Sequence, residues 1–100
     1  MANPIVVPAG AIQKDVDPNT LLPSRMELSK RRLEIQGRLL DEVVERFTPI
    51  QVNLDGIIWD GHHGVRAAAE KGRLIDVLVV AQPLTASGQR ILDLPVRGSP

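Results

Sequence analysis

The residues of this chain best suited to chemistry lie together between Asp60 and Arg66, where the sequence reads Asp-Gly-His-His-Gly-Val-Arg. An apolar stretch precedes this segment and an alanine-rich stretch follows it. A strand that leads through a glycine-containing loop into a helix presents that helix's free N–H groups and positive dipole end to a ligand above the loop. Phosphate is the ligand that such a loop favours. A polar turn with exposed histidines is the alternative, since short loops of this composition are common.

Gly61 and Gly64 leave room for a ligand to approach the backbone, and His62, His63 and Arg66 add hydrogen-bond donors. A histidine near its ordinary pKa can act as a general acid or base, or as a cationic phosphate contact, near neutral pH. Adjacent histidines on an extended segment point to opposite faces, so we expect one of them to reach the ligand. His63, at the entrance of the helix, is the preferred proton-transfer residue. Two solvated histidines are the alternative.

Asp60 and His62 complete the candidate catalytic set. The Asp60 carboxylate would accept a hydrogen bond from the loop backbone or hold a divalent metal, and the structural role is preferred. A metal site of two histidines and Asp60 is disfavoured, because ligands at consecutive positions rarely all reach one ion, so no residue is assigned to a metal. Arg66 falls in the first helical turn, where a cation is unfavourable against the helix dipole. A bound phosphate would compensate this charge; a salt bridge to Glu70 at i+4 is the alternative.

A long helix is expected over residues 29–46, ahead of this loop. Apolar residues recur there at helical spacing, and charged residues occupy the opposite face. Ser24 and Glu27 have the form of a capping box before this helix, and Pro49 ends the pattern. Basic residues of the helix would meet a phosphate backbone or, in the preferred interpretation, lie on a solvated face. These residues are Lys30, Arg31, Arg32 and Arg38.

Strands are expected on both sides of the loop. Residues 50–54 alternate between apolar and polar types, which is typical of a strand, and residues 57–59 form the return strand with Trp59 in the core. Asp55-Gly56 predicts a two-residue hairpin turn in which both residues have positive φ. A short helix over 65–71 with Gly72 as its C-terminal cap and a mostly buried strand over 74–80 follow.

The two ends of the chain are rich in proline and glycine. Prolines at this density exclude a helix from the first 23 residues and predict an extended, edge-like lead-in, with a turn at residues 17–20. The tail after residue 80 is expected to be loose or to dock as an edge strand. The order of elements predicts one α+β domain over residues 1–100, with a small mixed sheet, a long helix and a short helix behind the phosphate loop.

Composition narrows the function classes. The 100 residues include 12 Lys+Arg and 12 Asp+Glu, and zero net charge argues against tight, purely electrostatic binding of nucleic acid. The lack of cysteine excludes a disulfide scaffold and any cysteine-ligated metal. Trp59 and Phe47 are the aromatic residues, too few for a base-stacking platform. The apolar runs are too short to cross a bilayer and the first residues lack a secretory signal, so no membrane partner is expected.

From Trp59 to Gly72, and in the strand that follows, the chain resembles the ParB/sulfiredoxin-like family. In that family a strand leads into an Asp-Gly-x-x-Arg or Gly-x-His-Arg loop, an alanine-rich helix, a glycine and a strand. Asp60-Gly61 begin this motif here, and Arg66-Ala67-Ala68 match its Arg-Ala-Ala. Upstream elements extend the resemblance over residues 12–82, and by resemblance Arg25 is a second phosphate contact. Those elements are Val16-Asp17-Pro18-Asn19, Pro23-Ser24-Arg25 and Pro49-Ile50-Gln51-Val52.

The chain departs from the family pattern in three ways. Gly64 stands where the motif usually carries an arginine, so one phosphate contact is missing or is supplied by His63. Sulfiredoxins use a cysteine in this loop and the chain has none, which excludes sulfinic-acid reduction. Partition proteins of the family continue into a second nucleotide-contacting motif and a DNA-reading helix-turn-helix. Residues 1–100 contain neither, so a CTP-gated clamp and operator recognition are not expected.

The resemblance implies a phosphate- or nucleotide-binding core. The preferred function is phosphoester hydrolysis on DNA by a bacterial toxin-type nuclease; the alternatives are a non-catalytic nucleotide-binding or DNA-associated module and a small-molecule kinase. A nucleotide and a divalent metal such as Mg²⁺ are the cofactors considered. DNA or a nucleotide is the expected partner, with a homodimer or a cognate protein left open. The expected location is the cytoplasm, or a target cytoplasm for a toxin.

Overall fold

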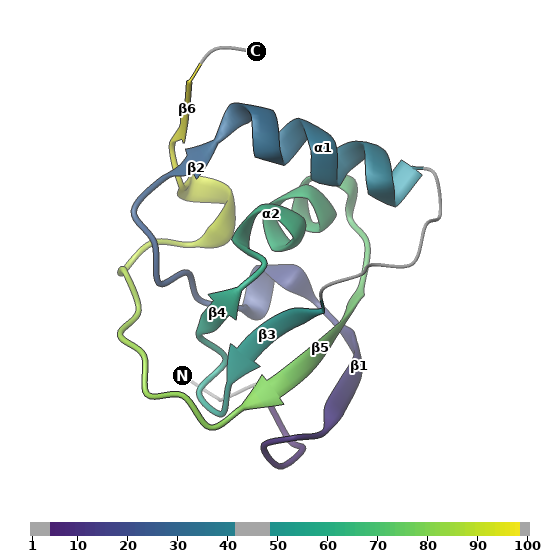
Figure 1. Ribbon diagram of the computed structural model, residues 1–100, viewed down its shortest axis with the longest axis vertical. Coiled ribbons are helices and arrows are strands. Elements are labelled where there is room, and N and C mark those ends of the chain that lie inside the picture. Colours follow the sequence, from purple (N-terminus) through teal and green to yellow (C-terminus); the bar gives the residue numbers. More distant parts are fainter. Residues whose placement is uncertain (1–4, 42–48, 99–100) are drawn as a thin grey trace.

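Four strands form a mixed sheet in the computed structural model, which describes residues 5–41 and 49–98 (Figure 1). Across the sheet the order is β1 (Ile12–Val16), β5 (Ile75–Val80), β3 (Ile50–Asn53) and β4 (Ile58–Asp60). The central pair, β3 and β5, is parallel, and both outer pairs are antiparallel. This arrangement confirms the predicted α+β class with a small mixed sheet, and the predicted strands before and after the short helix.

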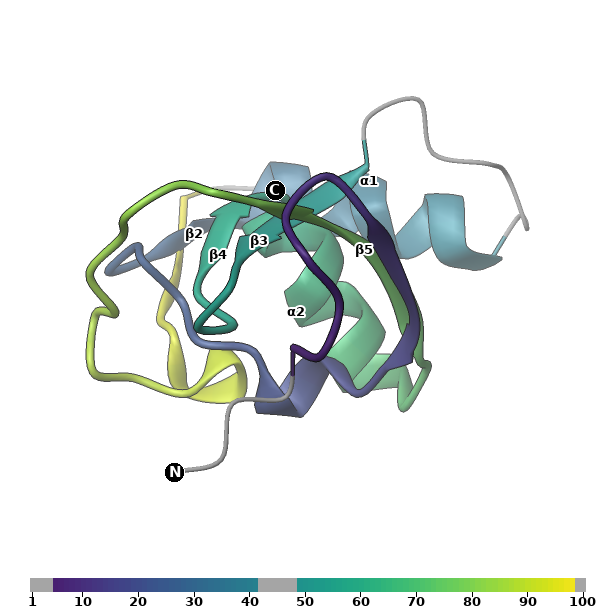
Figure 2. The same ribbon diagram turned by 90° about the horizontal axis from the view of Figure 1, so that it is seen from below.

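Two α-helices accompany the sheet. Helix α2 (His62–Lys71) follows β4 directly and contacts β3, and α1 (Lys30–Asp41) packs on α2 (Figures 1 and 2). Val65 and Ala68 of α2 are fully buried in the core between these elements. Within the described part of the chain, neither helix has the length and apolar character needed to cross a bilayer.

Helix α1 begins one residue after the predicted start, at Lys30. The last part of the predicted helix, residues 42–46, lies outside the described residues. The capping box at Ser24 and Glu27 was wrong as a helix start, since it lies well before the first helical residue. Ser29 precedes the helix instead, and its Oγ lies 3.5 Å from the N–H of Arg32, which is the position of an N-cap acceptor.

Helix α2 begins three residues earlier than the predicted 65–71 helix, so the two histidines lie in its first turn and not in a loop. Gly61 adopts a left-handed conformation (φ 101°) immediately before the helix, which lets the chain turn sharply from β4 into α2. The predicted cap at Gly72 is confirmed: its φ is 64° and its N–H donates to carbonyls of the last turn.

The β3–β4 hairpin is confirmed, but its turn differs from the prediction. Gly56 is the one residue of the turn with positive φ, and its N–H donates to the carbonyl of Asn53 at 3.0 Å. The N–H of Asn53 donates to Ile57 at 2.9 Å, which leaves a three-residue loop at 54–56. A three-residue loop that ends in a left-handed glycine needs positive φ only there, whereas the predicted two-residue turn needs it twice.

Residues 5–20 and 91–97 both pack on the rest of the domain. The N-terminal lead-in is extended and forms the edge strand β1, as predicted, and the predicted turn is the 3₁₀ helix η1 (Pro18–Thr20). The tail docks: η2 (Ile91–Asp93) buries Ile91, and β6 (Val96–Arg97) pairs in parallel with β2 (Leu28–Ser29). The hydrophobic core therefore takes in Ile91 and Leu94, beyond residues 12–82.

Candidate anion-binding pocket

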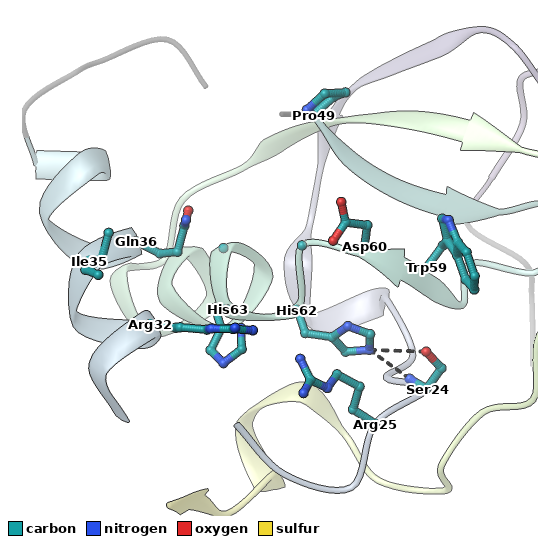
Figure 3. Close-up of a pocket in the computed structure, with 12 residues that line it drawn as sticks. Ser24, Arg25, Arg32, Ile35, Gln36, Pro49, Trp59, Asp60, His62 and His63 are labelled. Carbon is teal, nitrogen blue, oxygen red and sulfur yellow. Dashed lines mark hydrogen bonds between the residues drawn. The ribbon is translucent and has the colours of Figure 1, made fainter. Parts of the chain in front are cut away.

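A pocket of about 480 Å³ opens where the end of β4, the first turn of α2, helix α1 and residues 24–25 meet (Figure 3). Asp60, Gly61, His62, His63, Gly64 and Arg25, all predicted site residues, line it together. Arg66 is not among the lining residues. The pocket lining comprises Ser24, Arg25, Arg32, Ile35, Gln36, Pro49, Trp59, Asp60, Gly61, His62, His63 and Gly64.

The N-terminus of α2 forms one wall of this pocket. Val65 donates the first helical hydrogen bond, to the carbonyl of Gly61 at 3.0 Å. The N–H groups of His62, His63 and Gly64 precede that bond and so lack a partner within the helix. No side chain in the described part of the chain caps this end of α2. The backbone therefore offers hydrogen-bond donors and the positive end of a helix dipole at the pocket.

His62 is buried, with 4% of its surface exposed, and its Nε2 atom accepts a hydrogen bond from the backbone N–H of Ser24 at 3.0 Å. The Ser24 hydroxyl lies 3.3 Å from the same nitrogen (Figure 3). It donates its proton to the carbonyl of Ile58 at 2.6 Å. Because the hydroxyl proton is directed to a carbonyl, Ser24 and His62 do not form an activated nucleophile and its base.

His63 makes the equivalent contact on the next residue of the helix. It is 8% exposed, and its Nε2 atom accepts a hydrogen bond from the backbone N–H of Ser29 at 2.9 Å. Acceptance at Nε2 assigns the proton of each neutral imidazole to Nδ1. Both rings are therefore neutral in the geometry of the structure, and Nδ1–H is the donor that each has left.

The surroundings of both histidines favour the neutral form. Burial, the Arg25 charge and then His63 lower the pKa of His62 to about 4. Burial, Arg25 and then Arg32 likewise lower the pKa of His63. A neutral imidazole whose Nε2 is occupied is a poor general acid near neutral pH. Both residues line the pocket expected at this segment, but their pKa values are lower than the ordinary values assumed from the sequence.

Two arginines supply positive charge to the pocket. Arg25 was expected there from the family resemblance, and Arg32 of α1 was assigned to a solvated helix face. No local signal in the sequence marks Arg32, because its place at the pocket depends on the hydrogen bond between the Ser29 backbone and His63, which lies 34 residues away. Asp60, at the end of β4, is the exposed carboxylate of the lining.

An apolar wall completes the pocket. Trp59 is 48% exposed and lines the pocket together with Ile35 and Pro49. The prediction that Trp59 belongs to the core was wrong, because β4 is an edge strand and its alternate side chains face outward. An exposed indole beside a cluster of cations and N–H groups offers a flat surface to an aromatic or sugar group.

Arg66 is bound elsewhere. Its Nη1 atom donates to the carbonyls of Ile91 at 3.1 Å and Leu94 at 2.8 Å, and its Nε atom pairs with Glu70 at 3.2 Å. The salt bridge to Glu70, the alternative to a phosphate contact, is thus present. These bonds direct the guanidinium to the C-terminal segment and not to the pocket lining.

Comparisons of the chain with family models, with curated proteins and with solved structures find no significant match. Within residues 5–41 and 49–98, no group of three His, Cys, Asp or Glu side chains is placed to hold a metal ion. The function is therefore inferred from the geometry of the pocket itself.

Proposed function

We propose that the pocket binds the phosphate group of a nucleotide or related phosphoester, and that the chain acts as a phosphate-binding module. The main support is that two kinds of hydrogen-bond donor suited to an anion meet at one place. The N–H groups of the first turn of α2 and the guanidinium groups of Arg25 and Arg32 line one pocket. Helix N-termini and arginine forks are the two features that proteins most often use for phosphate.

The charge balance of the pocket supports an anionic ligand. With both histidines neutral, the charged residues of the lining are Arg25, Arg32 and Asp60. The pocket therefore has two positive charges and one negative charge. Phosphate oxygens would accept hydrogen bonds from the two guanidinium groups and from the N–H groups of the first turn of α2, and a guanidinium can bind two of those oxygens at once.

The rest of the lining supports a ligand larger than phosphate. Trp59 and Pro49 offer an apolar surface for a base or sugar. In the wall of the same pocket, Gln36 Oε1 is a buried acceptor that finds no hydrogen-bond partner among the described residues, and a donor on the ligand would satisfy it. The resemblance of the strand–glycine–helix segment to the ParB/sulfiredoxin-like family supports the same ligand class, a nucleotide.

Hydrolysis of a DNA phosphoester is the second candidate, because the Asp60 carboxylate lines the pocket beside the proposed phosphate position. Asp60 would serve as the base, since the Nε2 atoms of both histidines already accept backbone protons. Proton transfer by His63, the preferred catalytic role from the sequence, would have to use Nδ1.

Isothermal titration calorimetry of the whole chain with nucleoside mono-, di- and triphosphates tests the binding proposal. We expect saturable binding that Arg25→Gln and Arg32→Gln each weaken by about tenfold, the typical cost of one charge-assisted hydrogen bond. Arg90→Gln is the matched control, because Arg90 is exposed, pairs with Asp93 and lies outside the pocket lining. Equal weakening by all three variants, or no binding by the wild type, contradicts the proposal.

Incubation of the same samples with DNA, with and without Mg²⁺, separates the two candidates. Cleavage that Asp60→Asn abolishes while nucleotide binding persists would favour the hydrolase. Intact DNA in samples that bind nucleotide would favour the module.

A further inference from the structure

His62 and His63 hold the two ends of one short piece of chain, residues 24–29. His62 accepts the N–H of Ser24 at 3.0 Å, and His63 accepts the N–H of Ser29 at 2.9 Å. We propose that both histidines are positioning residues, which fix the 24–29 segment against the first turn of α2 and so set Arg25 and Arg32 at the anion pocket. The proposal concerns the regulation of the proposed binding site and rests on that function.

The directions of the two histidine side chains fit this positioning role. Neighbouring side chains on an α-helix are about 100° apart around its axis, so they reach two separate points of a crossing segment. Additional bonds anchor the same ends: the Ser24 hydroxyl donates to Ile58 of β4 at 2.6 Å, and Leu28 donates to Pro95 at 2.9 Å. Leu28 is itself buried in the core.

Residues 25–27, between the two anchors, are exposed to solvent. Glu27 pairs with Arg97 on the surface at 3.2 Å, a weak tie, so the path of the backbone depends mainly on its ends. Arg25 lies one residue from the Ser24 anchor, and Arg32 lies in the first turn of the helix that follows the Ser29 anchor. Loss of either imidazole acceptor would therefore loosen the backbone that carries a pocket arginine.

The two bonds require neutral imidazoles. A protonated imidazole carries hydrogen on both nitrogens, so it cannot accept the N–H of Ser24 or Ser29. The charged groups that face the histidines are Arg25 from the 24–29 segment, Arg32 from α1 and Asp60 from β4, and each histidine also faces the other. Protonation would thus add positive charge where two arginines already lie and would remove both anchors.

The positioning role predicts the direction in which anion affinity changes with pH. Histidines that contact an anion directly bind it more tightly when they are protonated. Histidines that position the arginines act through their neutral rings on the backbone and not on the anion, so acid loosens the 24–29 segment and weakens binding. The direction of the pH effect therefore distinguishes a positioning role from direct contact.

Amide hydrogen exchange of the whole chain by NMR tests the holding role without any ligand. In His63→Phe, which keeps a ring but removes the acceptor, we expect the Ser29 amide to exchange about tenfold faster, while the Val79 amide in the sheet stays protected. His63→Gln, whose side-chain oxygen can accept in place of Nε2, should restore much of the protection. Equal exchange of the Ser29 amide in wild type and in a folded His63→Phe would overturn the proposal.

The wild-type protein alone provides the second test, which does not depend on any variant folding. Sulfate, whose charge is nearly constant from pH 7 to pH 3.5, is the anion probe. We expect sulfate affinity to fall with pH in step with lower protection factors of the Ser24 and Ser29 amides, which correct exchange for its intrinsic dependence on pH. Affinity that rises as the pH falls would overturn the positioning role. A wild type that binds neither sulfate nor nucleotide contradicts the proposed function. If acid still lowers the protection of the Ser24 and Ser29 amides together in that case, the histidines do fix the 24–29 segment.

Discussion

Gly61 lies directly against Ile50: a Cβ atom on Gly61 would come within 2.9 Å of Ile50 Cγ1 and 3.2 Å of Ile50 Cα. The contact joins the residue before α2 to the first residue of β3. It holds the first turn of α2 close to the sheet, and the same turn forms the wall of the pocket. Gly61 also has a φ of 101°, which side chains rarely adopt.

Gly61→Ala should therefore destabilise the protein by about 2–4 kcal/mol, because both the backbone strain and the backbone contact oppose a methyl group. Gly72→Ala is the matched control. Gly72 has a positive φ as well, but no described atom lies within 4 Å of its Cβ position, so we expect a cost of about 1 kcal/mol. Urea unfolding of both variants measures the difference, and equal costs would show that the Ile50 contact relaxes freely.

Arg66 should contribute to stability rather than to ligand binding. Arg66→Lys removes the forked bonds to the carbonyls of Ile91 and Leu94, so we expect a loss of about 2–3 kcal/mol in the free energy of unfolding, with nucleotide affinity unchanged. Glu70→Gln removes only the salt bridge and should cost about 0.5 kcal/mol or less. A variant of Arg66 that keeps its stability but loses nucleotide affinity would restore this arginine as a ligand contact.

Local signals predicted the elements around the pocket. The strand 75–80, the hairpin at Gly56 and the cap at Gly72 each depend on residues close in sequence, and each was found within a few residues of its expected place. The positions of Asp60, Gly61 and the two histidines at one pocket followed from the same strand-to-helix pattern.

The partners of the site residues depend on contacts between distant parts of the chain. His62 and Ser24 are 38 residues apart, and Arg66 reaches Leu94 across 28 residues, so no local pattern could reveal either bond. Trp59 was misplaced because its exposure depends on β4 lying at the sheet edge, which is a property of the strand order. Helix propensity also failed to predict the start of α2, because the turn there is stabilised by Gly61 packing on Ile50.

Asn53 should be among the most sensitive polar residues of the hairpin. It is 4% exposed; its Oδ1 atom accepts from the N–H groups of Asp55 and Ile57, and its Nδ2 atom donates to the carbonyl of Gln82. Asn53→Ala leaves these groups without partners, so we expect a loss of about 2–3 kcal/mol in thermal or urea unfolding. Asp55→Ala, at an exposed neighbouring position, should change stability by about 0.5 kcal/mol or less. Similar losses in both variants would mean that the Asn53 bonds are replaced by water.

The pKa of His62 implies that acid destabilises the fold. In the folded protein the pKa is about 4, and in the unfolded chain it returns to the ordinary 6.5, so between these values the unfolded state binds the extra proton. The contribution of neutral His62 to the free energy of unfolding is fully present above pH 6.5. It is lost as the pH falls towards 4, and the total loss is about 3 kcal/mol. Urea unfolding at intervals from pH 7 to pH 4 measures this loss.

His62→Gln, which has no titrating group at this position, should show a shallower decline, so the difference between the two curves isolates His62. Parallel curves for wild type and His62→Gln would show that His62 keeps its ordinary pKa in the folded protein, and that its bond to the Ser24 N–H does not oppose protonation.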